Sequence, residues 1–115
     1  MKKNLLYLLY FILINFLYST NLVVEPYLQN ATPNSMHILW ETDSDSQSIV
    51  EWGEYIFLTE TTTGSSFANY GNSRIHTVEL TDLESSTRYY YRLVVGDSYS
   101  ELYDFITPPE PSSEA

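Results

Sequence analysis

The chain has 115 residues, a length that supports one domain, and it carries 15 Asp and Glu against 5 Lys and Arg. The formal net charge of -10 argues against partners such as nucleic acid and anionic lipid, because binding them requires Lys and Arg to displace counterions. Since there is no cysteine, a disulfide framework, a Cys-ligated metal and a thiolate nucleophile are excluded.

Residues 1–20 are predicted to be a signal peptide. Lys2 and Lys3 precede an apolar run from Leu5 to Tyr18, interrupted only by Asn15, which is the charged and apolar pattern of an export signal. The run is shorter than the roughly 20 residues that cross a bilayer as a helix. Export to a secreted, periplasmic or extracellular location is therefore expected, with no membrane association once the signal is removed. An uncleaved anchor is the alternative.

The remainder of the chain alternates between apolar and polar side chains in short runs, separated by clusters of Pro, Asn, Asp, Ser and Gly. Such runs are typical of β-strands and turns. In chain order they cover residues 22–29, 35–42, 47–53, 55–62, 74–80, 88–95 and 98–107.

Two further features complete the predicted topology. Residues 64–73 are expected to be a loose segment, and Gly96-Asp97 is expected to be a two-residue hairpin turn between the last two strands. About seven short antiparallel strands with no amphipathic helix predict an all-β, immunoglobulin-like or fibronectin type III β-sandwich, preceded by the helical signal segment.

The period-2 alternation also predicts the core. Five aromatic side chains are expected to form it: Trp40, Trp52, Tyr89, Tyr91 and Phe105. The same alternation leaves Tyr90 and Tyr99 outside. Packing is the expected use of these tyrosines, and a platform on which sugars stack is the alternative.

The segment Leu83 to Tyr91 resembles the tyrosine corner of fibronectin type III domains, in which a Tyr hydroxyl bonds back to the backbone, and it nominates Tyr89 for that role. A larger set of segments, in order from about Leu22 to Pro109, resembles the N-terminal domain of purple acid phosphatases. The segments are residues 25–29 (EPYLQ), 32–36 (TPNSM) with Trp40, 50–53 (VEWG), 76–80 (HTVEL), 89–92 (YYYR) and 103–109 (YDFITPP). Residues 84–86 (ESS) depart from the Pro-Gly turn that is common in the family.

The resemblance implies a domain at residues 22–108 and a linker at 109–115 leading to a separate catalytic domain. Purple acid phosphatases are exported metallophosphoesterases that hydrolyse phosphate monoesters at a dinuclear metal centre, Fe with Fe, Zn or Mn, in a C-terminal α/β domain. The implied partner of this chain is that metallophosphatase domain of the same parent protein, and the implied cofactor lies there.

The chain's own residues predict no catalytic and no metal-binding site. Gly96-Asp97 matches the start of a metal-binding motif but is expected to be a hairpin turn. With only His37 and His76, a histidine-rich metal site cannot be assembled. The stretch from Asp43 to Gln47 has calcium-loop spacing at its start, but it lacks the Gly and Glu that such loops require.

Four residues are nevertheless candidates for interaction or modification. His76, Tyr90 and Pro108 are candidates for contacting a neighbouring domain, and Asn30, in Asn30-Ala31-Thr32, fits the N-glycosylation acceptor pattern. Two functions therefore stand. The first is a non-catalytic N-terminal module of a secreted acid phosphatase. The alternative is a self-standing fibronectin-like module for adhesion or for binding carbohydrate or protein.

Overall fold

The structure, a computed structural model, describes residues 19–112. The regular secondary structure of this part of the chain consists of strands joined by turns and loops. The strands are β1 (Leu22–Thr32), β2 (Ser35–Thr42), β3 (Ile49–Gly53), β4 (Glu60–Thr63), β5 (Ser65–Ala68), β6 (Arg74–Leu80), β7 (Arg88–Val95), β8 (Ser98–Tyr99) and β9 (Tyr103–Ile106). Residues 19–112 contain no helix long and apolar enough to cross a membrane. The predicted signal segment lies outside the described residues up to residue 18, as does the end of the predicted linker, residues 113–115.

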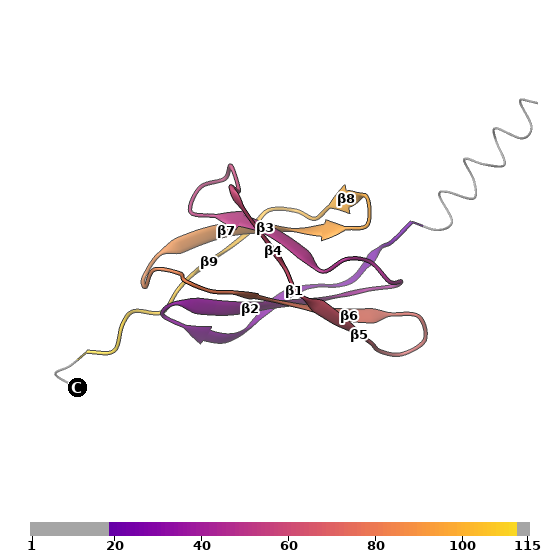
Figure 1. Ribbon diagram of the computed structural model, residues 1–115, viewed down its shortest axis with the longest axis horizontal. Coiled ribbons are helices and arrows are strands. Elements are labelled where there is room, and N and C mark those ends of the chain that lie inside the picture. The colour runs from indigo at the N-terminus through magenta and orange to yellow at the C-terminus, as the bar shows by residue number, and fades with distance from the viewer. Residues whose placement is uncertain (1–18, 113–115) are drawn as a thin grey trace, which may run out of the picture.

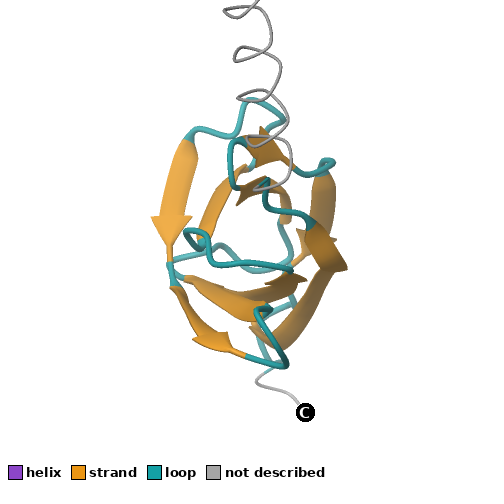
Figure 2. Cartoon of the chain, turned by 90° about the vertical axis from the view of Figure 1, so that its right-hand side faces the viewer, coloured by secondary structure: helices purple, strands orange, loops and turns teal. Residues whose placement is uncertain are grey.

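Two antiparallel sheets pack face to face (Figure 1). One has the order β1-β2-β6-β5, and the other has the order β4-β3-β7-β8, with β9 also paired to β7. Figure 2, turned by 90°, shows the strands surrounding a single interior. The predicted all-β sandwich is confirmed. Its strands exceed seven because 60–68 forms two short strands and the last predicted strand is divided into β8 and β9.

The core follows from the alternation within the strands. In β2, Met36, Ile38 and Trp40 are buried while the residues between them are only half-buried, and β7 repeats the pattern. The buried apolar residues of the two sheets form one cluster: Met36, Ile38, Trp40, Val50, Val78, Leu80, Leu83, Tyr89, Tyr91, Leu93, Val95 and Phe105.

Gly64 is the point at which the chain passes from one sheet to the other, between β4 and β5. Its N–H donates to the carbonyl oxygen of Ser48 at 2.8 Å. A Cβ at this position would lie 1.9 Å from the carbonyl oxygen of Thr77. Because that separation is far inside van der Waals contact, only glycine fits this crossing.

Irregularities interrupt a strand in each sheet. In β1, Asn30 has a φ of 53° where the register with β2 shifts, which is the geometry of a β-bulge. Between β8 and β9, Ser100 bonds both backbone groups of Leu93. The Leu93 carbonyl accepts from the Ser100 N–H at 2.9 Å, and the Leu93 N–H donates to the Ser100 hydroxyl at 2.8 Å. The serine thereby preserves the hydrogen bonding of β7 across the break.

The chain enters the sandwich at one end and leaves it at the other. At the N-terminal end, Asn21 and Asp43 are clasped by three hydrogen bonds. The Asp43 carboxylate accepts from the Asn21 backbone N–H at 2.9 Å and from its side-chain amide at 3.0 Å, and the Asp43 N–H donates to the Asn21 carbonyl at 3.0 Å.

At the C-terminal end, the Ser86 N–H donates to the carbonyl of Pro108 at 3.2 Å. This end also contains the turn 33–34 and the loops 54–59 and 81–87, since Gly53 and Ile106 pair with the first residues of β7. In Figure 1 it is the left-hand side, where the C-terminal segment leaves.

Several predicted strand boundaries were wrong. Residues 55–58 form a turn, with Leu58 at a φ of 51°, and the strand expected from residue 55 begins only at Glu60. The segment 64–73, expected to be loose, contains β5, which pairs with β6. The first strand, predicted to end at Gln29, continues to Thr32 because the bulge at Asn30 lets pairing resume.

Gly64→Ala should lower the free energy of unfolding by about 3 kcal/mol, because the methyl group would collide with the backbone of Thr77 and Val78 in β6. Gly71→Asn is the matched control. Gly71 has a φ of 66°, which Asn tolerates, and no atom lies within 4 Å of the position that a Cβ would occupy there. Urea denaturation measures both variants, and equal stability of the two would contradict this account of Gly64.

Candidate functional site

The tyrosine corner lies at the C-terminal end, as expected for Tyr89. The Glu84 N–H donates to the Tyr89 hydroxyl oxygen at 2.8 Å, and Leu83 beside it is buried. The Tyr89 ring also contacts Trp52 at a centroid distance of 5.7 Å and Phe105 at 5.8 Å. The corner therefore attaches the loop 81–87 to the core at the end of the sandwich where β7 begins and β9 ends.

Thr107 closes this end of the sandwich from the other side. Its side chain is 2% exposed, and its hydroxyl donates to the Glu84 carbonyl at 2.6 Å while accepting from the Thr87 N–H at 3.0 Å. Thr107 is not among the residues predicted from the sequence, although its place two residues after Phe105 in an alternating strand indicates an inward side chain. The direction in which the chain leaves the domain is fixed by these bonds.

Four of the five expected core aromatics lie deep in the interior, namely Trp40, Tyr89, Tyr91 and Phe105. Trp52 is the exception. It is half-buried at the margin of the core, where its indole N–H donates to the Thr62 hydroxyl at 2.9 Å.

Tyr91 and Tyr103 stack at the other margin of the aromatic cluster, with ring centroids 5.6 Å apart. Burial, followed by the neighbouring Tyr103 and Asp104, raises the pKa of Tyr91 to about 12. Burial and the nearby Glu25 and Glu101 also raise the pKa of Tyr103. Both hydroxyls are therefore neutral at ordinary pH and serve packing rather than acid–base chemistry.

His76 lies in the core at 0% exposure, so its predicted role as a docking residue was wrong. Its ring stacks on Trp40 with centroids 5.0 Å apart and planes 8° from parallel. Its Nε2 is 2.7 Å from the Thr42 hydroxyl, and its Nδ1 is 2.8 Å from the Ser48 hydroxyl. Inward alternation in β6 was visible in the sequence, but the two hydroxyls that make burial tolerable come from distant segments.

The hydrogen bonds around His76 determine its tautomer. The Thr42 hydroxyl donates its proton to the carbonyl of Ser44 at 2.8 Å, so toward His76 it can only accept. Nε2 therefore carries the proton, and Nδ1 accepts from Ser48. Burial, followed by the positive charge of Arg74, lowers the pKa of His76, against a smaller opposing effect of Asp45. The ring is neutral and has no free nitrogen for a metal.

The other two docking candidates lie nearer to the surface. Tyr90 is half-buried on the outer face of the five-stranded sheet, and Pro108 is half-buried just beyond β9. Around Tyr90 the face is polar, because Arg88 pairs with Asp104 and Arg92 pairs with Glu51.

The alternative of a sugar-stacking platform is not supported by the position of Tyr99. The Arg92 guanidinium lies 3.7 Å from the centroid of the Tyr99 ring and covers one of its faces. The glycosylation acceptor Asn30 is exposed in the bulge of β1, and its modification stays a prediction.

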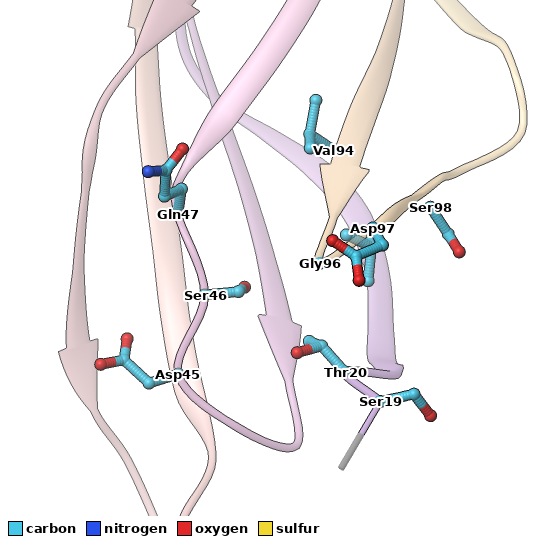
Figure 3. A pocket seen from close by; sticks show the side chains of 10 residues that line it. Ser19, Thr20, Asp45, Ser46, Gln47, Val94, Gly96, Asp97 and Ser98 are labelled. Atoms are coloured by element: carbon cyan, nitrogen blue, oxygen red, sulfur yellow. The ribbon is translucent and has the colours of Figure 1, made fainter. Parts of the chain in front are cut away.

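A hollow lies at the N-terminal end, where the chain enters the domain (Figure 3). Asp45 and Asp97 border it from different loops, together with hydroxyl side chains such as Thr20 and Ser46. Asp97 belongs to the two-residue turn between β7 and β8, as predicted. Asp43, the start of the calcium-like spacing, is engaged by Asn21, whose N–H bond lowers the pKa of the Asp43 carboxyl.

Metal-ligand chemistry is not assembled in the described part of the chain. Within residues 19–112 no group of three or more His, Asp and Glu side chains could hold a metal ion. The nitrogens of His76 are occupied by hydroxyls, and His37 pairs with Glu79 at 3.1 Å on the sheet surface. These residues do not fit the dinuclear centre that the family resemblance implies.

The sheet order, the core Trp of β2 and the tyrosine corner define a fibronectin type III-like sandwich domain. Residues 24–107 match the family described as the purple acid phosphatase N-terminal domain. The chain belongs to that family.

Known proteins of the same kind are similar over this region. Purple acid phosphatase 1 of Ipomoea batatas is 33% identical over 84 residues, which cover 67% of this chain and 18% of that protein. Acid phosphatase type 7 of Danio rerio is 36% identical over 80 residues, covering 63% of this chain and 18% of that protein. The chain therefore corresponds to less than a fifth of the length of these relatives.

Among solved structures, the sensor domain of the anti-sigma factor RsgI4 in Pseudobacteroides cellulosolvens has a TM-score of 0.60 at 18% identity, covering 82% of this chain and 94% of that one. Its solution structure has a TM-score of 0.53 at 21% identity, covering 81% and 82%. At this level of identity the likeness concerns the fold alone.

Tyr89→Phe should lower the free energy of unfolding by about 1 to 2 kcal/mol, because the Glu84 N–H loses its partner while the ring contacts stay. Tyr70→Phe is the control, since Tyr70 is 92% exposed and its change should stay within about 0.5 kcal/mol. Chemical denaturation of the two variants compares them directly. A cost for Tyr89→Phe no greater than that for Tyr70→Phe would contradict the corner's role.

Below about pH 6.5 the domain should lose stability through His76. The unfolded chain takes up a proton at the ordinary pKa of 6.5, whereas the folded chain, whose His76 pKa is lowered, takes it up only at lower pH. The contribution is thus complete above the unfolded pKa and is lost as pH falls through the window down to the folded pKa. Unfolding free energies measured from pH 7.5 to 5 should show a smaller slope in His76→Gln, which keeps His37. Identical slopes would contradict the prediction.

Proposed function

We propose that this chain is the non-catalytic N-terminal module of a purple acid phosphatase-like metallophosphoesterase. The observation that carries the proposal is the family match over residues 24–107, joined to relatives named as purple or acid phosphatases that are more than five times longer than the matched region. In the proposal, hydrolysis of phosphate monoesters takes place outside residues 19–112, at a dinuclear metal centre in a following domain.

The role of the module in this proposal is to pack beside the catalytic domain as a rigid body. Three features support rigidity at the end where the chain leaves: the Tyr89 corner, the buried Thr107 hydroxyl and the bond from Ser86 to Pro108. Because Thr107 is held from two sides, the exit of the chain has one direction, and a following domain would be placed consistently. Export, suggested by residues 1–20, belongs to the same proposal.

The coding sequence downstream of Ala115 tests this proposal most directly. A following segment with Gly-Asp-x-Gly and Gly-His-x-His motifs would supply the Asp and His ligands that two metal ions need. A stop codon, or a second β-module in that place, would contradict it and favour a self-standing binding module.

The isolated chain is expected not to hydrolyse p-nitrophenyl phosphate, with Fe, Zn or Mn added, because residues 19–112 assemble no ligand cluster. The assay should cover pH 4 to 8. Hydrolysis that follows the folded domain through purification, and that disappears when urea unfolds the domain, would show that the chain itself contains a site.

A further inference from the structure

The loop between β3 and β4 exposes three consecutive large apolar side chains. Tyr55 is 70% exposed, Ile56 is 63% exposed and Phe57 is 82% exposed. Residues 55–58 form a tight turn closed by a bond from the Leu58 N–H to the Tyr55 carbonyl at 3.2 Å, and the φ of Leu58 is 51°. The turn thus presents these side chains to solvent. Apolar groups gathered in this way usually mark an interaction site.

An acidic groove adjoins the loop. It runs between the loop 54–59 and the loop 81–87, with Trp52 and Tyr89 among its lining residues. Four carboxylates border it, on Glu54, Glu60, Asp82 and Glu84, and no Lys or Arg is among the residues that line it.

The arginines of the described chain are engaged elsewhere. Arg74 contacts Ser66 and lies 3.7 Å from Asp45, Arg88 pairs with Asp104, and Arg92 pairs with Glu51. The charge of the groove is therefore left for a partner to balance.

Loop and groove lie at the end from which the chain leaves the domain. The exit is held beside them, since Ser86 binds the carbonyl of Pro108 and the Thr107 hydroxyl binds the carbonyl of Glu84, a groove residue. Figure 1 shows the β3–β4 loop on the same side of the sandwich as the C-terminal segment. A fully extended chain advances at most about 14 Å over the four residues that follow Pro108. A domain that follows on a short linker starts next to this surface.

The geometry points to the Tyr55–Phe57 loop and its acidic groove as the docking surface for the domain that follows this one, with a Lys or Arg of that domain entering the groove beside apolar side chains that cover Phe57. The inference rests on the proposed function, which supplies the following domain. This docking surface takes the place of the buried His76 as the expected contact. It also differs from a surface centred on Tyr90, where the charges are already balanced by ion pairs.

Amide hydrogen exchange on the full-length parent protein tests the apolar part. Residues 55–59 should exchange at least about tenfold more slowly than residues 69–73, a loop at the opposite end whose Tyr70 is 92% exposed. Phe57→Ser should remove most of that difference and increase protease cleavage between the domains several-fold. Tyr70→Ser should change neither, and both residues are exposed enough for the fold to survive the substitution.

The charge part has its own variants. Asp82→Asn with Glu60→Gln should increase interdomain cleavage several-fold at low salt and reduce its dependence on salt concentration. Asn tolerates the φ of 58° at position 82. The control pair is Asp97→Asn with Glu101→Gln, which lies away from the groove and should leave cleavage unchanged.

Three outcomes would overturn the inference. The first is equal amide exchange of the two loops, and the second is equal effects of Phe57→Ser and Tyr70→Ser. The third is self-association of the isolated chain in sedimentation experiments together with slow exchange of residues 55–59 in that self-associated form, which would mean that a second copy covers the loop. Its failure is separable from failure of the proposed function. A parent protein that hydrolyses p-nitrophenyl phosphate while residues 55–59 exchange freely has the proposed function with a different docking surface. A parent protein without a phosphatase domain contradicts both.

Discussion

The packing of Trp40 on His76 is the interaction on which the sandwich depends. Trp40 in β2 is paired directly with His76 in β6, and the His76 Nδ1 is hydrogen-bonded to Ser48, in the segment that leads into β3 of the opposite sheet. A polar ring in an apolar core is stable only when its hydrogen bonds are made. Thr42 and Ser48 make both, and the Ser48 bond ties the first sheet to the segment that leads into β3 of the other sheet.

Strict alternation made most of this fold predictable. The bounds of 35–42, 74–80 and 88–95 agree with β2, β6 and β7, because these strands bury one face and leave the other mostly half-buried. Prediction failed where one side of a segment meets no core. The apolar residues 55–58 have strand propensity but form a turn. Residues 65–68, which have no buried side chain, form an edge strand by pairing with β6, and the Arg74 side chain bonds Ser66 within it.

The candidate site was less predictable than the fold for a related reason. The role of Tyr89 could be inferred from a local spacing, because the bond to Glu84 spans five residues. The environment of His76 could not, since Thr42 and Ser48 are 34 and 28 residues away. A docking surface poses the same difficulty, because the loops 54–59 and 81–87 become neighbours only when β3 and β7 pair.

The two clasps at opposite ends of the sandwich give the domain a mechanical axis. Asn21 is bound to Asp43 at one end, and Thr107 is bound to Glu84 and Thr87 at the other. Tension between these points runs along the strands, whereas the ladder hydrogen bonds lie across them. The bonds of β1 to β2 and of β9 to β7 would then be sheared together rather than opened one after another. A pull along this axis would therefore load many ladder hydrogen bonds at once.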